Sequence, residues 1–206
     1  MYLNRFSPLR IIYVIESNEF WDERYKSVDW PIHPDASLVE LAGDLTPGKV
    51  LDVGCGPARN SIWLAEKGWE VTGIDASKIG LELASVRAER VGVNLNLIHD
   101  DILAYDYGKE LFDLAIIANI HMATEVSNSL FDKVVDSLKP QGHLFVVGHH
   151  VKSLGVAGPP DPDLLYTLDK FDNSFTALSF VHISEVVRNN DNDEPNLYDV
   201  VIWGSK

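Results

Sequence analysis

The sequence predicts an α/β fold in one domain, with a mainly parallel sheet covered by helices. Short runs of β-branched residues alternate with helix-like segments, which is the pattern of βαβ units. The length of 206 residues suits one domain. Near the C-terminal end only a short turn separates two strand-like runs. These two runs should pair antiparallel, because a parallel pair needs a crossover of about a dozen residues or more.

Seven segments of the chain have the character of strands. The first five alternate with helix-like stretches and should be parallel, whereas the last two should form the terminal hairpin. The expected strands cover residues 49–53, 70–74, 95–98, 112–118, 143–147, 178–188 and 197–204. We therefore expect a three-layer sandwich around a seven-stranded sheet.

Two helices are expected around the second strand. The first covers residues 59–67 and ends before Gly68, a residue that suits a left-handed C-cap. Ser77 should cap the second, which has a clear apolar face and ends at Gly92.

Helix and turn signals continue through the second half of the chain. Thr124 should cap a helix that Pro140 ends, and short helices are expected over 164–171 and between the third and fourth strands. The acidic run from Asp191 to Glu194 is expected to be a solvated turn.

Composition limits the classes of partner and compartment. Seventeen Lys and Arg against 31 Asp and Glu give a net charge of −14, which repels nucleic-acid phosphates. The single cysteine, Cys55, excludes an internal disulfide and a multi-cysteine zinc site, so a reducing compartment, the cytoplasm, is expected. The apolar run from Ile11 to Ile15 is too short for a signal peptide, and no stretch is long enough to span a membrane.

A glycine-rich loop follows the first predicted strand. Gly54 and Gly56 lie between that strand and a helix, where ligands bind in open α/β sheets and where glycine lets the backbone approach a ligand closely. A nicotinamide-binding loop has a third glycine or alanine at the position that Arg59 occupies here. The pattern therefore fits a ligand-binding loop and weakens the interpretation that the loop binds the pyrophosphate of a dinucleotide.

The sequence Asp52-x-Gly54-x-Gly56 resembles motif I of the class I S-adenosylmethionine-dependent methyltransferases. The best-matched part is residues 49–148. The resemblance implies a Rossmann-like fold with strand order 3-2-1-4-5-7-6 and S-adenosylmethionine as cofactor.

The same resemblance implies cofactor-binding roles for particular residues. Asp52 would help to hold the methionine amino group, with Gly54, Cys55 and Gly56 as the loop. Asp75, followed by Ala76 after the second strand, would bind the ribose hydroxyls. Asp101 would accept from the adenine amine and Ile102 would pack on the ring, although Asp100 is an alternative to Asp101. Asn119 begins a segment, reaching to Met122, that would close over the methionine moiety, and Lys139-Pro140-x-Gly142 is a further family signature.

The segment ahead of the first strand also carries a likeness. Glu19-Phe20-Trp21-Asp22-x-x-Tyr25 resembles the opening of small-molecule methyltransferases of the thiopurine and tellurite-resistance groups. Residues 1–45 are therefore interpreted as a cap or lid on a core formed by 46–206. Packing is favoured over substrate contact for Trp21 and Tyr25, and packing over nucleophilic chemistry for Cys55.

Three histidines are candidate catalytic residues. His121 follows the fourth strand, and His149 and His150 follow the fifth, so all three should lie at the carboxyl end of the sheet. Each could act as a base or be a structural histidine. Their spacing does not support a metal site, and no metal is expected. The segment from His149 to Tyr166, with two glycines and three prolines, should form part of the substrate wall.

These observations predict methyl transfer to a small-molecule acceptor. Amino-methylating relatives carry Asn-Pro-Pro-Tyr or Asp-Pro-Pro-Tyr after the fourth strand, whereas this chain has Ala-Asn-Ile-His. Together with the acidic charge, this argues against a nucleobase acceptor. The alternatives are a nicotinamide-dependent oxidoreductase and a non-catalytic module that binds S-adenosylmethionine.

Overall fold

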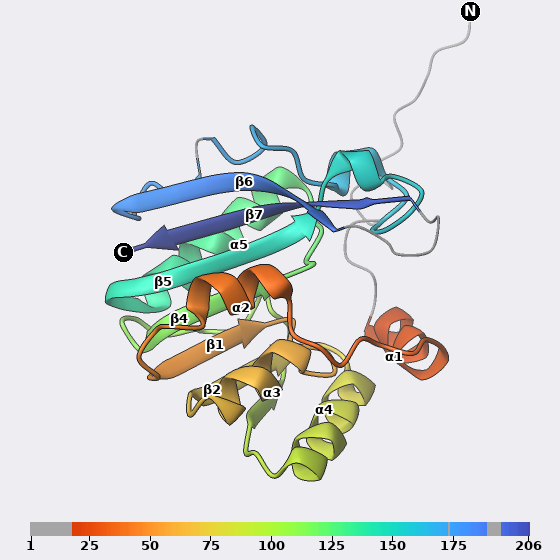
Figure 1. The fold of residues 1–206 in the computed structure, drawn as a ribbon, viewed down its shortest axis with the longest axis vertical. Coiled ribbons are helices and arrows are strands. Elements are labelled where there is room, and N and C mark those ends of the chain that lie inside the picture. Colours follow the sequence, from red (N-terminus) through yellow and green to blue (C-terminus); the bar gives the residue numbers. More distant parts are fainter. Residues whose placement is uncertain (1–17, 173, 189–194) are drawn as a thin grey trace, which may run out of the picture.

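Seven strands form one sheet in the order β3-β2-β1-β4-β5-β7-β6 (Figure 1). The computed structural model describes residues 18–172, 174–188 and 195–206. The turn predicted at Asp191 to Glu194 lies outside these residues. The strands are β1 (Lys49–Val53), β2 (Glu70–Asp75), β3 (Asn96–His99), β4 (Phe112–Ala118), β5 (Leu138–His149), β6 (Phe180–Arg188) and β7 (Leu197–Ser205).

Strand direction agrees with the sequence prediction. Strands β1 to β5 pair in parallel, and β7 pairs antiparallel with both β5 and β6. The carboxyl ends of the parallel strands therefore meet at one edge of the sheet, where the glycine loop and the segments after β4 and β5 also lie.

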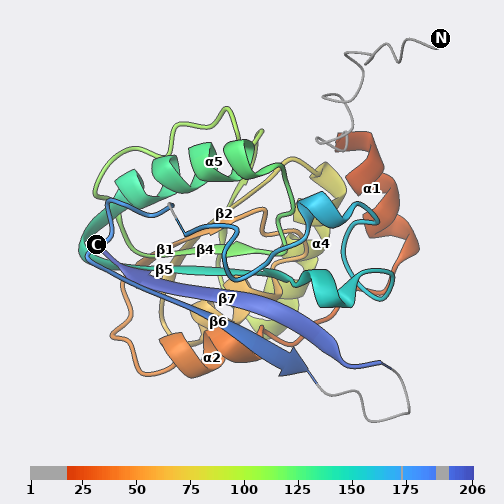
Figure 2. The same cartoon turned by 90° about the horizontal axis from the view of Figure 1, so that it is seen from above.

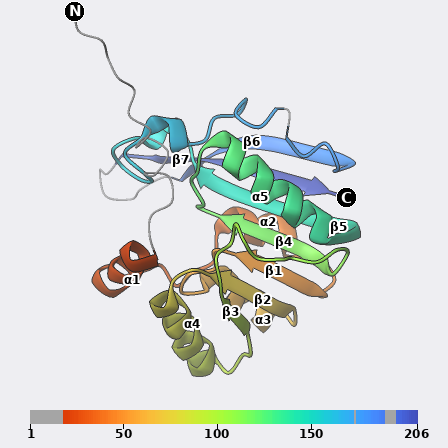
Figure 3. The same ribbon diagram turned by 180° about the vertical axis from the view of Figure 1, so that it is seen from behind.

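Helices cover both faces of the sheet (Figure 2). On one face lie α2 (Ala36–Ala42) and α3 (Arg59–Glu66), and on the other lies α5 (Thr124–Ser137). The helix α4 (Lys78–Val91) packs against β2 and β3. Seen from behind, α1 (Asn18–Ser27) lies beside α4, outside the layers (Figure 3). No helix among the described residues has the length and apolar character to cross a membrane.

The start and end of α4 follow its predicted caps. Ser77 accepts a hydrogen bond from the Gly80 amide at 3.0 Å, and Gly92 ends the helix with φ 78°. The cap predicted at Thr124 is wrong. Ala123 occupies the N-cap of α5 and has no side-chain capping bond, and Thr124 is the first helical residue.

Two short helices predicted from the sequence do not form. Between β3 and β4, the carboxylates of Asp101 and Asp106 bind the amides two residues on and hold the chain in turns. Only the 3-10 turn Pro162–Leu164 forms near the helix predicted over 164–171. The fifth strand also starts earlier than predicted, at Leu138, because the chain passes directly from α5 into the sheet.

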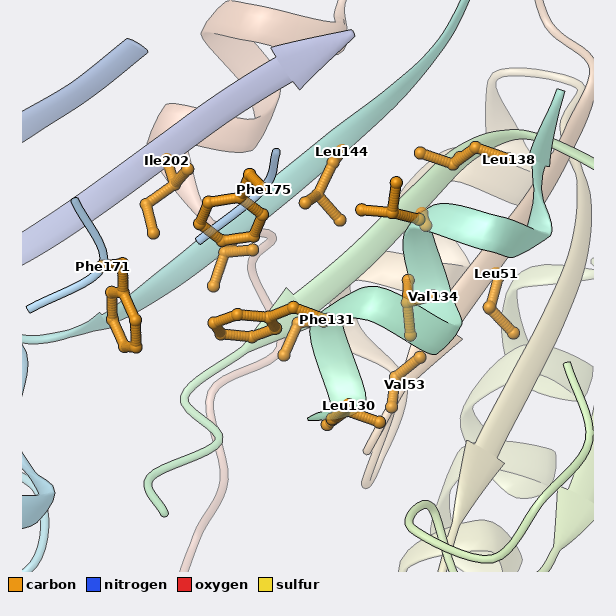
Figure 4. Close-up of a cluster of buried hydrophobic side chains, with 14 of the residues drawn as sticks. Leu51, Val53, Leu130, Phe131, Val134, Leu138, Leu144, Phe171, Phe175 and Ile202 are labelled. Atoms are coloured by element: carbon orange, nitrogen blue, oxygen red, sulfur yellow. The ribbon is translucent and has the colours of Figure 1, made fainter. Parts of the chain in front are cut away.

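Two clusters of buried side chains join the layers. On the α5 face, residues of β1, β4, β5 and β7 pack against α5 and against Phe171 and Phe175, which come from the segment after β5 (Figure 4). On the opposite face, Leu38 of α2 and Leu64 of α3 pack against β1, β4, β5 and β7. On this face the irregular segment after β5 thus adds to the cover that α5 provides.

Candidate cofactor and acceptor site

Backbone conformation makes the loop after β1 a tight cradle. Gly54 and Gly56 have φ of 68° and 51°, in the left-handed region that favours glycine. The amides of Gly54 and Cys55 donate to the Ile74 carbonyl at 2.7 and 3.0 Å, which ties the loop to the end of β2. A Cβ atom at Gly54 would overlap the Ile120 side chain, and one at Gly56 would lie 2.5 Å from the Tyr25 hydroxyl. The loop therefore has room only for glycine at both positions.

Asp75, at the end of β2, is the buried carboxylate beside this cradle. Its two oxygens accept from the amides of Gly56 and Ser77, each at 2.8 Å. Burial raises its pKa, although these two amide hydrogen bonds oppose the shift. Each carboxylate oxygen has a second acceptor position. Asp75 thus shapes the loop and keeps acceptor capacity for hydroxyl donors.

Asp52 is more deeply buried and points to α3. Its Oδ2 atom accepts a hydrogen bond of 2.7 Å from the Ser61 hydroxyl. Burial raises its pKa to about 6, and the nearby charge of Asp75 adds to the effect. The predicted role of Asp52 as partner of an amino group stays a prediction, and Ser61 is a contact that the sequence pattern did not indicate.

The other residues predicted to bind the cofactor differ in how exposed they are. Cys55 packs against Gly73 of β2, and burial raises the pKa of its thiol well above the usual value, which disfavours a thiolate.

Asp101 is exposed and binds the Leu103 amide at 2.8 Å, whereas Ile102 packs on the core. Asp100 accepts from the Asp101 amide at 2.8 Å. The carbonyl of Ala76 contacts the His99 ring at 3.0 Å.

Helix α1 contacts the cradle and the start of α4, whereas the sequence analysis expected only packing for its residues Trp21 and Tyr25. Tyr25 is buried between Gly56 and Gly80. Burial, with the Asp75 charge, raises the pKa of its hydroxyl, which stays protonated. Asp22 accepts from the Ser77 hydroxyl at 2.5 Å and from the Ile79 amide at 3.1 Å. The resemblance of residues 19–25 to small-molecule methyltransferases was the signal in the sequence that pointed to this segment.

The sequence and the fold of this chain are similar to those of known proteins. Residues 50–142 match the family described as a methyltransferase domain. The chain is 28% identical over 140 residues to a ubiquinone biosynthesis O-methyltransferase of Rickettsia felis, an alignment that covers 68% of this chain and 49% of that protein. The chain is therefore similar in sequence and in fold to S-adenosylmethionine-dependent methyltransferases.

Two further similarities are to a second curated protein and to a solved structure. The chain is 29% identical over 108 residues to a ribosomal RNA small subunit methyltransferase C of Alcanivorax borkumensis, covering 50% of this chain and 33% of that one. Its fold matches TehB from Haemophilus influenzae with a TM-score of 0.68 and 18% identity, over 92% of this chain and 66% of that structure. The chain thus spans between about a third and a half of these curated relatives.

The three candidate histidines do not form one group. The rings of His121 and His149 stack, with centroids 5.3 Å apart. His150 points elsewhere, because its Nδ1 atom accepts from the Lys152 amide at 3.0 Å and its Nε2 atom lies 3.4 Å from Glu185. In the described part of the chain, no group of three His, Cys, Asp or Glu side chains is arranged to hold a metal ion.

His121 has the environment of a structural histidine. Its Nδ1 atom lies 3.3 Å from the Leu164 carbonyl, and its Nε2 atom accepts from the His149 amide at 3.3 Å. Burial lowers its pKa to about 4, and His149 adds to this shift. Both ring nitrogens of a neutral His121 are therefore engaged. The contacts of His149 are different: its Nδ1 atom lies 2.9 Å from a carboxylate oxygen of Asp199.

The segment after β4 joins these histidines to the cradle. Asn119 has φ 59°, a left-handed conformation that asparagine tolerates, and its amide donates to the Val147 carbonyl at 2.7 Å. Ile120 follows and lies over Gly54. The carbonyl of Ile120 accepts from the buried Tyr166 hydroxyl at 2.8 Å. The ends of β1, β4 and β5 thus meet at one place.

Proposed function

We propose that this protein transfers the methyl group of S-adenosylmethionine to a small-molecule acceptor. The observation that carries the proposal is the cradle at the carboxyl edge of the sheet. Two glycines with positive φ form a loop that has no room for a Cβ atom, and a buried carboxylate, Asp75, accepts a hydrogen bond from the Gly56 amide directly beside them. Close backbone approach and a carboxylate for adjacent hydroxyls are the two features that a nucleoside ligand requires.

Each end of the cofactor has residues suited to hold it. Asp75 would accept from the ribose hydroxyls, Asp101 from the adenine amine, and Ile102 would pack on the adenine. The loop backbone and Asn119 would border the methionine moiety, with Asp52 behind the loop. A sulfonium methyl is already activated, so these residues act chiefly by holding the acceptor in line with the sulfur–carbon bond and by excluding water.

Charge and similarity favour a small acceptor over RNA. The net charge of −14 opposes a polyanionic acceptor. A relative aligned over 68% of this chain has a name that describes an O-methyltransferase of ubiquinone biosynthesis. Since an rRNA methyltransferase is also among the relatives, RNA belongs in the test as a competing acceptor.

The deciding experiment measures formation of S-adenosylhomocysteine by the full chain. The acceptors are a panel of phenols, thiols, amines and carboxylic acids, with ribosomal RNA as a separate arm. We expect turnover with at least one small molecule and none with RNA. Turnover with RNA alone would contradict the small-molecule assignment, and cofactor binding without turnover on any acceptor would favour a non-catalytic binding module.

A matched pair of variants links turnover to the cradle. Gly56→Val places a branched side chain against Tyr25 at a left-handed position, so cofactor binding and turnover should both be lost. Val91→Ala, at an exposed position in the last turn of α4, is the control and should behave as the parent. Circular dichroism establishes that the Gly56→Val protein is folded.

A further inference from the structure

A histidine and a buried carboxylate form a pair at the carboxyl edge of the sheet. His149 ends β5 and stands directly opposite Asp199 of β7 in the antiparallel register. The Nδ1 atom of His149 lies 2.9 Å from Oδ1 of Asp199, whose side chain is 4% exposed. Arg188 of β6 contacts both carboxylate oxygens, with its Nε atom 2.5 Å from Oδ2 and its Nη2 atom 3.2 Å from Oδ1.

This arrangement fixes which nitrogen of His149 carries the proton. Burial acts to raise the pKa of Asp199, but the hydrogen bond from His149 and the Arg188 charge outweigh it and hold that pKa below its usual value. An ionised carboxylate only accepts hydrogen bonds, so the Nδ1 atom of His149 is the donor, and in the neutral imidazole the lone pair is on Nε2. Within the described residues Nε2 has no hydrogen-bond partner, and the side chain is 17% exposed.

The pair lies beside the cofactor cradle. Contacts between the segment after β4 and the end of β5 continue past Ala118, because the Asn119 amide donates to the Val147 carbonyl and the His149 amide donates to the Nε2 atom of the His121 ring. Ile120, between Asn119 and His121, covers Gly54 of the cradle. The titratable and charged groups that face His149 are His121 by stacking, Asp199, and Arg188 through Asp199.

We propose that His149 is the general base for an acceptor whose nucleophile is a hydroxyl group, and that Asp199 and Arg188 are its positioning residues. The proposal rests on the proposed methyl transfer. The hydroxyl proton passes to Nε2 of His149 as the oxygen forms its bond to the methyl carbon. The carbon–sulfur bond of S-adenosylmethionine breaks, and its electron pair goes to sulfur to leave neutral S-adenosylhomocysteine. The second imidazole proton leaves to solvent after product release.

A chemical footprint tests the lone pair without any acceptor. Diethyl pyrocarbonate acylates unprotonated imidazole nitrogens, and mass spectrometry of the full chain locates the modified histidines. We expect His149 to be acylated and His121 to be protected, with exposed His33 as the reactive reference. In Asp199→Asn the extent of His149 acylation should differ from that in the parent, because the Asn side chain can both donate and accept and no longer fixes the tautomer of His149. The extent of His33 acylation should stay the same. A His149 that resists acylation while His33 reacts would overturn the proposal.

A pair of acceptors tests the base role by turnover. Catechol is protonated at neutral pH, whereas the sulfur of para-nitrothiophenol is largely ionised. With catechol, His149→Gln should lower turnover by about a hundredfold or more, and with para-nitrothiophenol by less than about tenfold. His182→Gln, at an exposed position on β6, is the control and should match the parent.

The outcomes separate the two proposals. An equal loss with both acceptors would mean that His149 only positions them, and would overturn the base assignment. If the parent binds S-adenosylhomocysteine but methylates neither probe nor any member of the small-molecule panel, the small-molecule function fails and the footprint alone decides the state of His149. If the parent does not bind the cofactor, the proposed function fails first.

Discussion

The Asp75 carboxylate lies beside the cradle and accepts hydrogen bonds from the amides of Gly56 in the loop and Ser77 at the start of α4. We predict that Asp75→Asn weakens binding of S-adenosylhomocysteine by about 1.5–3 kcal/mol, because the amide removes the charge from hydrogen bonds that the ribose hydroxyls would donate. Isothermal titration calorimetry measures the loss, with exposed Asp132→Asn as the matched control. Parental affinity in Asp75→Asn would contradict the ribose assignment.

The buried carboxyl group of Asp52 makes stability depend on pH. Burial raises its pKa from 3.8 to about 6, so the folded protein holds this proton more tightly than the unfolded chain. The free energy of unfolding therefore falls as pH rises through this range, and the loss is complete above it. At neutral pH this raised pKa lowers the free energy of unfolding by about 1–3 kcal/mol.

The corresponding prediction concerns Asp52→Asn, whose amide oxygen can still accept from Ser61. At neutral pH this variant should be more stable than the parent by about 1–3 kcal/mol, and the gain should disappear near pH 4, where the parent carboxyl group is protonated. Urea unfolding at both pH values measures the difference. A variant that is less stable at neutral pH would show that the charged form of Asp52 is favoured by the fold.

At the scale of elements, the Ser77 hydroxyl is one of the contacts that join α1 to α4. Ser77 caps α4 and donates to Asp22 of α1. We predict that Ser77→Ala lowers the free energy of unfolding by about 1–2 kcal/mol, and that the loss is not additive with Asp22→Ala because the two share this contact. Urea unfolding of the single and double variants measures the coupling.

Thr124→Ala is the control for this cap. Thr124 lies at the start of α5, where the structure has no side-chain cap, so its replacement should change stability by less than about 0.5 kcal/mol. Additive losses for Ser77→Ala and Asp22→Ala would show that α1 is not held through the cap.

The elements that could be predicted from the sequence are those that a local pattern marks. The strands and the terminal hairpin followed from β-branched runs and short connections, and Ser77 and Gly92 bounded α4 as expected. No periodic pattern indicates α2, because it has only seven residues. The pairing of His149 with Asp199 depends on the register of β5 and β7, which are far apart in sequence, so the sequence could nominate His149 but not its partner.

At the scale of the whole molecule, the core on the α5 face connects the sheet to the segment after β5. Phe131 of α5 packs against Phe171 and Phe175, with ring centroids 5.3 and 5.0 Å apart (Figure 4). We predict that Phe131→Ala costs about 3–5 kcal/mol and loosens residues 166–178. Urea unfolding measures the cost, and Phe180→Ala, at an exposed position of β6, should stay within about 0.5 kcal/mol. Equal effects of the two replacements would contradict this view of the core.

The central claim is that the cradle at the carboxyl edge of the sheet takes S-adenosylmethionine. Arg59 stands where a nicotinamide-binding loop has its third small residue, whereas the two glycines and Asp75 form the cradle that the structure shows. Isothermal titration calorimetry of the full chain with S-adenosylmethionine, S-adenosylhomocysteine and NADH tests this most directly. The account predicts micromolar binding of both sulfur compounds and no binding of NADH. Tighter binding of NADH than of either sulfur compound would contradict it.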